Sequence, residues 1–159
     1  MALNKQQLIA ELTGICNTHA INYADICITC GGASTIYNLR EETNDIDVDV
    51  CELEVWNKLV SIPGVKTKHY PALGLMTAAD VVSIGNVDFH WRDNNQEKDY
   101  IKNYSMYLGF NVSTKLELLE DRVKLGREKD LEDINLLKDE YQNLLSDELK
   151  QRLSKMLNG

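Results

Sequence analysis

The feature of this sequence that most limits its possible folds is the alternation of acidic and apolar residues from Asp45 to Val50. Successive side chains of a β-strand point to opposite faces, so the carboxylates of Asp45, Asp47 and Asp49 would share one face. The apolar residues between them would then face a core. Three carboxylates on one face repel one another, and a bound cation would relieve that repulsion. An exposed strand with a solvated acidic face would show the same alternation.

A glycine pair stands shortly before this strand. The segment Asp25–Cys30 is short and β-branched, which predicts a strand, and it ends at Gly31-Gly32, which predicts a tight turn. Glycines allow backbone N–H groups to come close to phosphate oxygens. Ser34 or Thr35 would add a hydroxyl contact. The pair therefore indicates a phosphate site, although Gly-Gly also serves many turns of no functional importance.

A later segment supplies a further carboxylate. Two β-rich runs surround Gly85-Asn86 and predict a hairpin. On the second run, Asp88 and His90 would lie on one face and the apolar residues on the other. If this run neighbours the alternating strand, Asp88 can approach the first two aspartates of that strand. For His90 we favour a hydrogen-bonded structural role over a place beside bound metals.

Three grouped carboxylates are suited to hard divalent cations such as Mg²⁺. A pair of such ions about 4 Å apart is the known arrangement for in-line phosphoryl or nucleotidyl transfer. The sequence thus predicts that Asp45, Asp47 and Asp88 bind Mg²⁺ or Mn²⁺, with two ions expected, and that Asp49 is less certain to take part.

The remaining hydrophobic patterns predict helices around these strands. Asn4 is a candidate cap for the first helix, and one more short strand is expected between Val65 and Met76. The predicted helices are Asn4–His19, Ala33–Arg40, Glu52–Ser61, Ser113–Leu125, one opened by Asp130 and one opened by Ser146-Asp147. We therefore expect an α+β fold: a small mixed β-sheet with helices on one face and a helical C-terminal tail. Residues 1–112 would form the core and residues 113–159 the tail, packed together as one compact unit.

Composition narrows the function classes. The chain has 159 residues, 43% of them hydrophobic, which is enough for one buried core. Its net charge of −8 does not favour nucleic acid as a partner, although a local basic patch could still bind it. No apolar run is long enough to span a bilayer and no signal segment opens the chain, so we expect a cytoplasmic protein without a membrane partner.

The combined pattern resembles the nucleotidyltransferase superfamily, whose fold includes DNA polymerase β, kanamycin and lincosamide nucleotidyltransferases, and abortive-infection proteins. Gly31-Gly32, Asp45-x-Asp47 and the later Asp88 match the glycine turn, the D-x-D strand and the third carboxylate of that family. The resemblance implies that the three aspartates hold the metals. It also places Asp88 near the acceptor hydroxyl as a base.

The segment from Leu125 to Asp133 adds a second resemblance, to the R-x-K-D-x-x-D segment of abortive-infection-type members. It implies that Arg127 and Lys129 contact nucleotide phosphates. It also implies that Asp130 caps the helix that follows and orients this segment. A charged helix start on a solvated face would have a similar sequence. With Gly31, Gly32 and Ser34, these two basic residues complete the expected nucleotide site.

The predicted function is metal-dependent transfer of a nucleoside monophosphate (NMP) from a nucleoside triphosphate (NTP) to an acceptor hydroxyl on a small molecule, a protein or RNA. The alternative is a catalytically silent binding module of the same fold, acting as an antitoxin, inhibitor or regulatory subunit. The small size of the chain favours that alternative, and the intact acidic set argues against it. A third reading is a toxin that adds nucleotides to tRNA ends, with a basic rim from Arg122, Lys124, Arg127 and Lys129.

Five aromatic residues gather late in the chain. They could stack on a base, but we favour packing between the sheet and the tail. They are Trp91, Tyr100, Tyr104, Tyr107 and Phe110.

Overall fold

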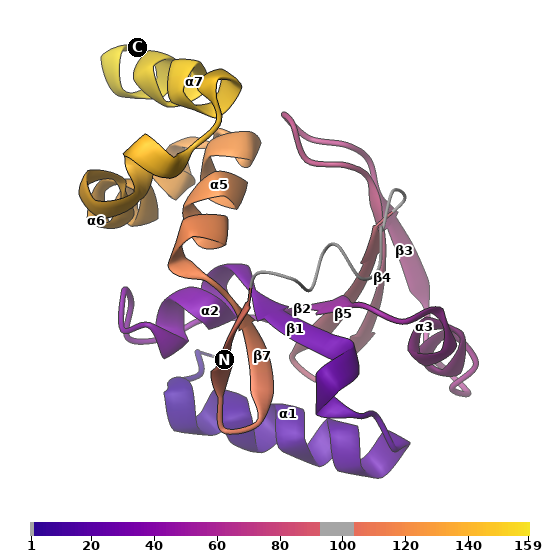
Figure 1. Cartoon of the computed structure of the whole chain (residues 1–159). Coiled ribbons are helices and arrows are strands. Elements are labelled where there is room, and N and C mark those ends of the chain that lie inside the picture. The colour runs from indigo at the N-terminus through magenta and orange to yellow at the C-terminus, as the bar shows by residue number, and fades with distance from the viewer. Residues whose placement is uncertain (1, 93–103) are drawn as a thin grey trace.

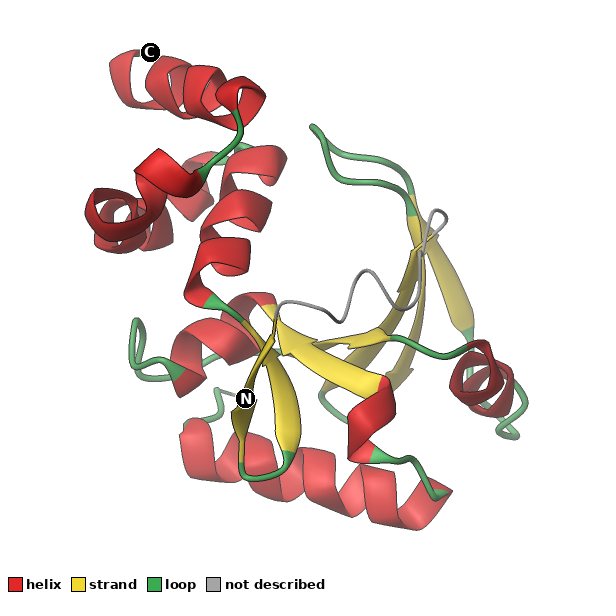
Figure 2. Cartoon of the chain, in the orientation of Figure 1, coloured by secondary structure: helices red, strands yellow, loops and turns green. Residues whose placement is uncertain are grey.

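A computed structural model describes residues 2–92 and 104–159 of the chain. Its centre is one seven-stranded mixed sheet in the order β3-β4-β5-β2-β1-β7-β6 (Figures 1 and 2). The strands are β1 (Ile26–Thr29), β2 (Ile46–Val50), β3 (Thr67–Tyr70), β4 (Ala79–Ile84), β5 (Val87–Arg92), β6 (Tyr104–Tyr107) and β7 (Phe110–Ser113). The α+β architecture expected from the sequence is confirmed.

Helices lie around this sheet (Figure 2). In chain order they are α1 (Lys5–His19), α2 (Cys30–Ile36), α3 (Leu53–Val60), α5 (Lys115–Leu125), α6 (Leu131–Tyr141) and α7 (Asp147–Asn158), with short 3-10 turns η1 (Tyr23–Asp25), η2 (Glu128–Asp130) and η3 (Gln142–Leu144). Asn4 caps α1 as predicted, in a reciprocal capping box with Gln7. None of the helices in the described ranges is both long and apolar enough to cross a membrane.

Strand β2 holds the middle of the sheet. It pairs antiparallel with β1 and parallel with β5, and this register sets Asp47 directly opposite Asp88. The apolar positions of both strands, including Val48 and Phe89, face the core and are fully buried. The acidic positions face the other way. The period-two prediction for both strands is therefore confirmed.

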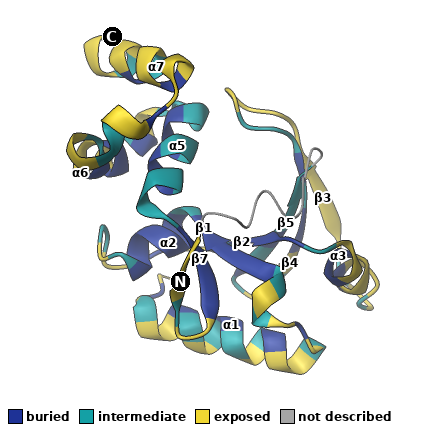
Figure 3. Cartoon of the chain, in the orientation of Figure 1, coloured by how far each residue is buried: buried dark blue, intermediate teal, exposed yellow. Residues whose placement is uncertain are grey.

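Two hydrophobic clusters stabilise the fold (Figure 3). The larger joins the apolar face of the sheet to α1 and α3, through residues such as Leu8, Leu12 and Trp56. The smaller lies within the tail, where Leu118, Ile134 and other apolar residues pack α5, α6 and α7 together. The predicted boundary between residues 112 and 113 stays a prediction.

The hairpin β6–β7 was not expected from the sequence. Its turn is Leu108-Gly109, and both residues have positive φ angles of 49° and 86°. Two-residue hairpin turns with positive φ normally contain Asn, Asp or Gly at the first position, so leucine gave a weak signal. The hairpin also corrects the start of the helix predicted over Ser113–Leu125. Ser113 belongs to β7, and Thr114 caps α5 by accepting a hydrogen bond from the Glu117 backbone N–H at 3.1 Å.

The core position of Phe89 yields a stability prediction. Its side chain is fully buried between the sheet and the helices. Phe89→Ala should lower the free energy of unfolding by about 3–5 kcal/mol, because it removes apolar contacts and leaves a cavity. Urea unfolding followed by circular dichroism measures the loss. Met106→Ala on the edge strand β6, where the side chain is 65% exposed, should change it by no more than about 0.5 kcal/mol.

Candidate active site

The acidic face of the sheet forms the floor of a cleft of about 710 Å³. The start of α2, the loop that joins β3 to β4 and the first part of the tail form its walls. Its polar lining includes Gly31, Arg40, Asp45, Asp47, Tyr70, Asp88, His90, Arg92, Arg122, Arg127 and Lys129. The three carboxylates predicted to act together therefore face one space, and the two predicted basic residues face the same space.

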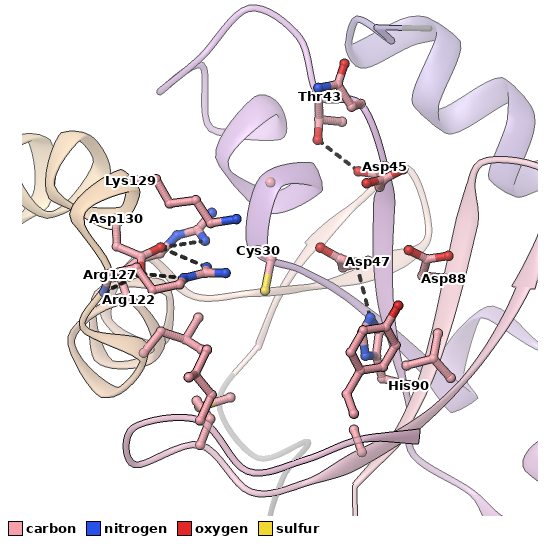
Figure 4. A pocket seen from close by; sticks show the side chains of 18 of the residues that line it. Cys30, Thr43, Asp45, Asp47, Asp88, His90, Arg122, Arg127, Lys129 and Asp130 are labelled. Atoms are coloured by element: carbon pink, nitrogen blue, oxygen red, sulfur yellow. Dashed lines mark hydrogen bonds and ion pairs between the residues drawn. The ribbon is translucent and has the colours of Figure 1, made fainter. Parts of the chain in front are cut away.

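The carboxylates come from two adjacent strands. Asp47 and Asp88 are paired across β2 and β5, and Asp45 lies just before β2 (Figure 4). Burial raises the pKa of Asp45, and the nearby charges of Asp88 and Asp47 raise it further. The carboxyl of Asp45 therefore lies within electrostatic range of the other two. A cation between them would remove the repulsion.

Neighbouring side chains hold two of these carboxylates. The Nε2 atom of His90 lies 3.1 Å from Oδ1 of Asp47, and the Ser83 hydroxyl donates to Oδ1 of Asp88 at 2.5 Å. Burial by itself lowers the pKa of His90, but the hydrogen bond to Asp47 and the charges of Asp49 and Asp47 outweigh it and raise the pKa. His90 therefore has the hydrogen bond expected of a structural histidine.

The donor set fits a hard cation in chemistry, because carboxylate oxygens are the ligands that Mg²⁺ prefers. In residues 2–92 and 104–159, however, no three His, Cys, Asp or Glu side chains are grouped closely enough to hold a metal ion. Metal binding would therefore require the carboxylates to move from their positions in this structure, where Asp47 contacts His90 and Asp88 contacts Ser83.

The tail supplies a cationic wall opposite the carboxylates. Figure 4 shows Arg127 and Lys129 on one side of Cys30, and Asp47 and Asp88 on the other. Asp130 does not cap the helix α6 with its side chain. It accepts from the Arg127 backbone N–H at 3.0 Å and from the Arg127 guanidinium at 2.9 and 3.0 Å. The arginine is therefore held in place at the edge of the cleft.

A buried carboxylate ties this wall to α2. Oδ2 of Asp133 accepts from the Ser34 hydroxyl at 2.8 Å, from Arg40 at 3.0 Å and from Arg122 at 3.1 Å. Arg122 also reaches Asp130 at 3.3 Å, and its own side chain is only 6% exposed. The side chain of Arg122 is thus held within this network, although the residue was expected to contribute to an open basic rim.

The glycine pair lies in the first turn of α2, not in a tight turn before a helix, because the helix already starts at Cys30. A Cβ on Gly31 would lie 2.7 Å from Oγ1 of Thr43, and one on Gly32 would lie 3.0 Å from a methyl of Ile28. Both positions therefore need glycine for close packing. Of the three predicted phosphate contacts on this segment, only Gly31 is part of the cleft lining.

Gly32 is packed toward the core, and Ser34 is fully buried with its hydroxyl donated to Asp133. The sequence could not reveal this, because the partner of Ser34 lies 99 residues away. Ser34 therefore positions the tail instead of facing the cleft. Cys30 does line the cleft, but burial, followed by the charge of Asp47, raises the pKa of its thiol to about 12. Its thiol is therefore neutral at ordinary pH.

Of the aromatic residues, Phe110, Trp91 and Tyr107 pack with the main core of the sheet, whereas Tyr104 is 41% exposed. Phe110 stacks on Tyr23 with ring centroids 4.0 Å apart, and Trp91 stacks on Trp56 at 6.2 Å. Tyr100 lies outside the described residues. The aromatic side chain in the cleft is instead Tyr70 from β3. Tyr70 falls in the segment where one more short strand was expected, but its place in the cleft follows only from the pairing of β3 with β4.

No family description and no curated protein matches the sequence. A solved structure of a "putative nucleotidyltransferase" from Helicobacter pylori is 14% identical, with a TM-score of 0.54 over 97% of this chain and 77% of that one. The JHP933 protein of Helicobacter pylori is 13% identical, with a TM-score of 0.53 over 96% and 75%. The chain therefore has a nucleotidyltransferase-like fold, as the sequence predicted.

Two further acids lie on α5, the first helix of the tail. The pKa of Glu117 is raised to about 7, first by burial and then by the charge of Asp121. The pKa of Asp121 is raised to about 6, first by burial and then by the charge of Asp49. Both groups bind protons more strongly in the folded chain than in the unfolded one. Each group therefore makes the fold less stable as the pH rises from its ordinary pKa in the unfolded chain to its raised pKa in the folded chain.

Glu117 offers a test of this effect. Its ordinary pKa is 4.5, so its contribution to stability should decline between about pH 4.5 and pH 7. Glu117→Gln should raise the melting temperature at pH 8 and leave it nearly unchanged at pH 4.5. Melting curves over this range would show it. Glu41→Gln in an exposed loop is the control and should shift neither value. An equal gain at both pH values would contradict the assignment.

Proposed function

We propose that this protein transfers a nucleoside monophosphate from an NTP to an acceptor hydroxyl and releases pyrophosphate, in a metal-dependent reaction. One observation carries the proposal. Asp47 and Asp88 stand in register on neighbouring strands, beside Asp45, and face a cleft whose opposite wall is cationic. Such an arrangement suits a reaction in which negative charge builds up on phosphate oxygens. The nucleotidyltransferase-like fold is consistent with it.

The carboxylates of Asp45, Asp47 and Asp88 would hold one or two divalent cations, Mg²⁺ or Mn²⁺. Cations bound there would activate the acceptor hydroxyl and neutralise charge on the triphosphate. Asp88 would also lie closest to the acceptor hydroxyl and accept its proton. His90 and Ser83 would set the starting orientation of the carboxylates they contact.

The triphosphate would lie toward the tail. Arg127 has its guanidinium fixed by Asp130, so it loses little side-chain freedom when it meets a phosphate. Lys129 is exposed at the same wall and adds a mobile positive charge. Gly31 also lines the cleft, where its backbone would meet a phosphate. These groups would orient the leaving pyrophosphate away from Asp88.

A catalytically silent binding module remains the second candidate, and one observation favours it. The carboxylates are not grouped as a ready metal site within the part of the chain that the structure describes, and two of them are hydrogen-bonded to neighbours. Such a module would bind a partner or a nucleotide through the same cleft without transferring a nucleotide.

Substitution of one carboxylate tests catalysis. Asp47→Asn keeps the size of the side chain but removes its charge, so it should reduce label transfer from an α-labelled NTP at least about a hundredfold. The measurement uses NTPs, Mg²⁺ or Mn²⁺ and a cell extract as the source of acceptor. Asp139→Asn, at a side chain that is 84% exposed, should retain full transfer. Transfer that survives in both Asp47→Asn and Asp45→Asn would exclude the mechanism.

Metal titration tests whether the cleft binds a divalent cation, which the silent binding module would not require. Binding to the folded chain alone raises its melting temperature. Addition of Mn²⁺ together with an NTP should therefore raise the melting temperature of the wild-type protein, and should not do so for Asp47→Asn. A wild-type protein that shows no metal-dependent rise, with or without NTP, would favour the silent binding module.

A further inference from the structure

The direction of in-line transfer sets where the acceptor must bind, if the proposed function holds. The attacking hydroxyl and the leaving pyrophosphate lie on opposite sides of the α-phosphorus. With pyrophosphate at Arg127 and Lys129, the acceptor arrives from the other side of Asp47. That side is the part of the sheet formed by β5, β4 and β3, which continues the cleft floor beyond Asp88.

The strand register maps this part of the floor. His90 on β5 is opposite Val81 on β4, which is opposite Lys68 on β3. Residues directly opposite in neighbouring strands have side chains on the same face. His90 and Val81 line the cleft. Lys68 therefore lies on the cleft face as well, as the outermost member of this row.

A second row runs parallel to the first. Arg92 on β5 is opposite Ala79 on β4, which is opposite Tyr70 on β3, and all three line the cleft. The middle residues of the two rows, Ala79 and Val81, are small and apolar. Each exposes only 3% of its surface. The floor beyond the carboxylates is therefore smooth, with a cation and an aromatic ring standing at its outer border.

Strand β3 is at the end of the sheet and is exposed along its whole length (Figure 3). The ammonium group of Lys68 lies 5.2 Å from the ring centroid of Tyr70, and that ring is 45% exposed. An exposed aromatic ring beside a mobile cation is the combination that holds a nucleotide, because the base stacks and the phosphate pairs with the cation. Tyr70 makes no ring stack with another aromatic residue among those described.

We propose that Lys68 and Tyr70 form an acceptor subsite that binds a nucleotide unit, with its base on Tyr70 and its phosphate at Lys68. The unit carries the hydroxyl that reaches Asp88. It would come either from the 3′ end of a single-stranded RNA or from a free nucleotide, which share this chemistry. The net charge of −8 opposes long-range attraction of RNA, so recognition would depend on these local contacts.

The transfer step balances with these groups alone. The acceptor hydroxyl oxygen forms a bond to the α-phosphorus of the NTP, and its proton passes to the Asp88 carboxylate. The bond from the α-phosphorus to the bridging oxygen breaks, and pyrophosphate leaves with the electron pair. The product is the acceptor extended by one NMP. No oxidant or reductant is required.

The test measures binding of the acceptor separately from binding of the NTP. A short single-stranded oligoribonucleotide, labelled at its 5′ end, is titrated with the full chain and followed by fluorescence anisotropy. Tyr70→Ala should weaken its binding about tenfold, and Tyr70→Phe should retain it, because stacking needs the ring and not the hydroxyl. Lys68→Ala should weaken binding and reduce the slope of log affinity against log salt by about 0.7.

Two matched variants serve as controls. Tyr104→Ala removes a tyrosine of similar exposure from the strand at the other end of the sheet, and Lys155→Ala removes a lysine from the last helix. Both should bind the oligoribonucleotide as the wild type does. The affinity for NTP with Mn²⁺, measured without acceptor, should be unchanged in all these variants. Equal melting temperatures would verify folding.

The outcomes separate this inference from the proposed function. Wild-type protein that binds no NTP with Mn²⁺ would defeat the proposed function. If NTP binds but Tyr70→Ala leaves oligoribonucleotide binding unchanged, the acceptor subsite is wrong. It is also wrong if the control variants lose as much affinity for the oligoribonucleotide as Tyr70→Ala does. Label transfer in extract to a protein, undiminished by Tyr70→Ala, would also overturn it. A nucleoside monophosphate that competes as strongly as the oligoribonucleotide would identify the free nucleotide as the source.

Discussion

Two walls of the cleft, the start of α2 and the tail, depend on a single buried carboxylate. Asp133 is 1% exposed, and its Oδ2 accepts from Ser34 on α2 and from Arg40 and Arg122 on either side. A buried charge of this kind is costly unless it is paired, so α2 and the tail stabilise each other only when they are docked together. The position of Arg127 at the cleft follows from the same docking, since its partner Asp130 also contacts Arg122.

The acidic floor could be predicted because it follows from local rules. Alternation of side chains along a strand depends only on neighbouring residues. The turn at Gly85 predicts the hairpin that carries Asp88. The pairing of β2 with β5 then required only that two such strands be adjacent. Residues on one face of adjacent strands meet by necessity, and Asp47 and Asp88 do so in register.

The parts that escaped prediction depend on distant contacts. Ser34 looked like a phosphate contact because it follows two glycines, but its hydroxyl is taken by a carboxylate 99 residues later. The β6–β7 hairpin escaped because Leu108 adopts a positive φ that leucine disfavours. The place of Tyr70 in the cleft became visible only when the register of β3, β4 and β5 was known. For Ser34 and Tyr70 the missing information was which distant residue or strand each one contacts. Local sequence preferences do not contain that information.

The close contact at Gly31 has an evolutionary consequence. The space that a side chain at 31 would need is occupied by the Thr43 hydroxyl, which donates at 2.8 Å to the backbone carbonyl of Asp45. A homologue with alanine or serine at 31 should therefore carry a smaller residue at 43, and it would need another way to hold the turn before β2. These two positions are expected to co-vary, and the orientation of Asp45 should change in lineages where they do.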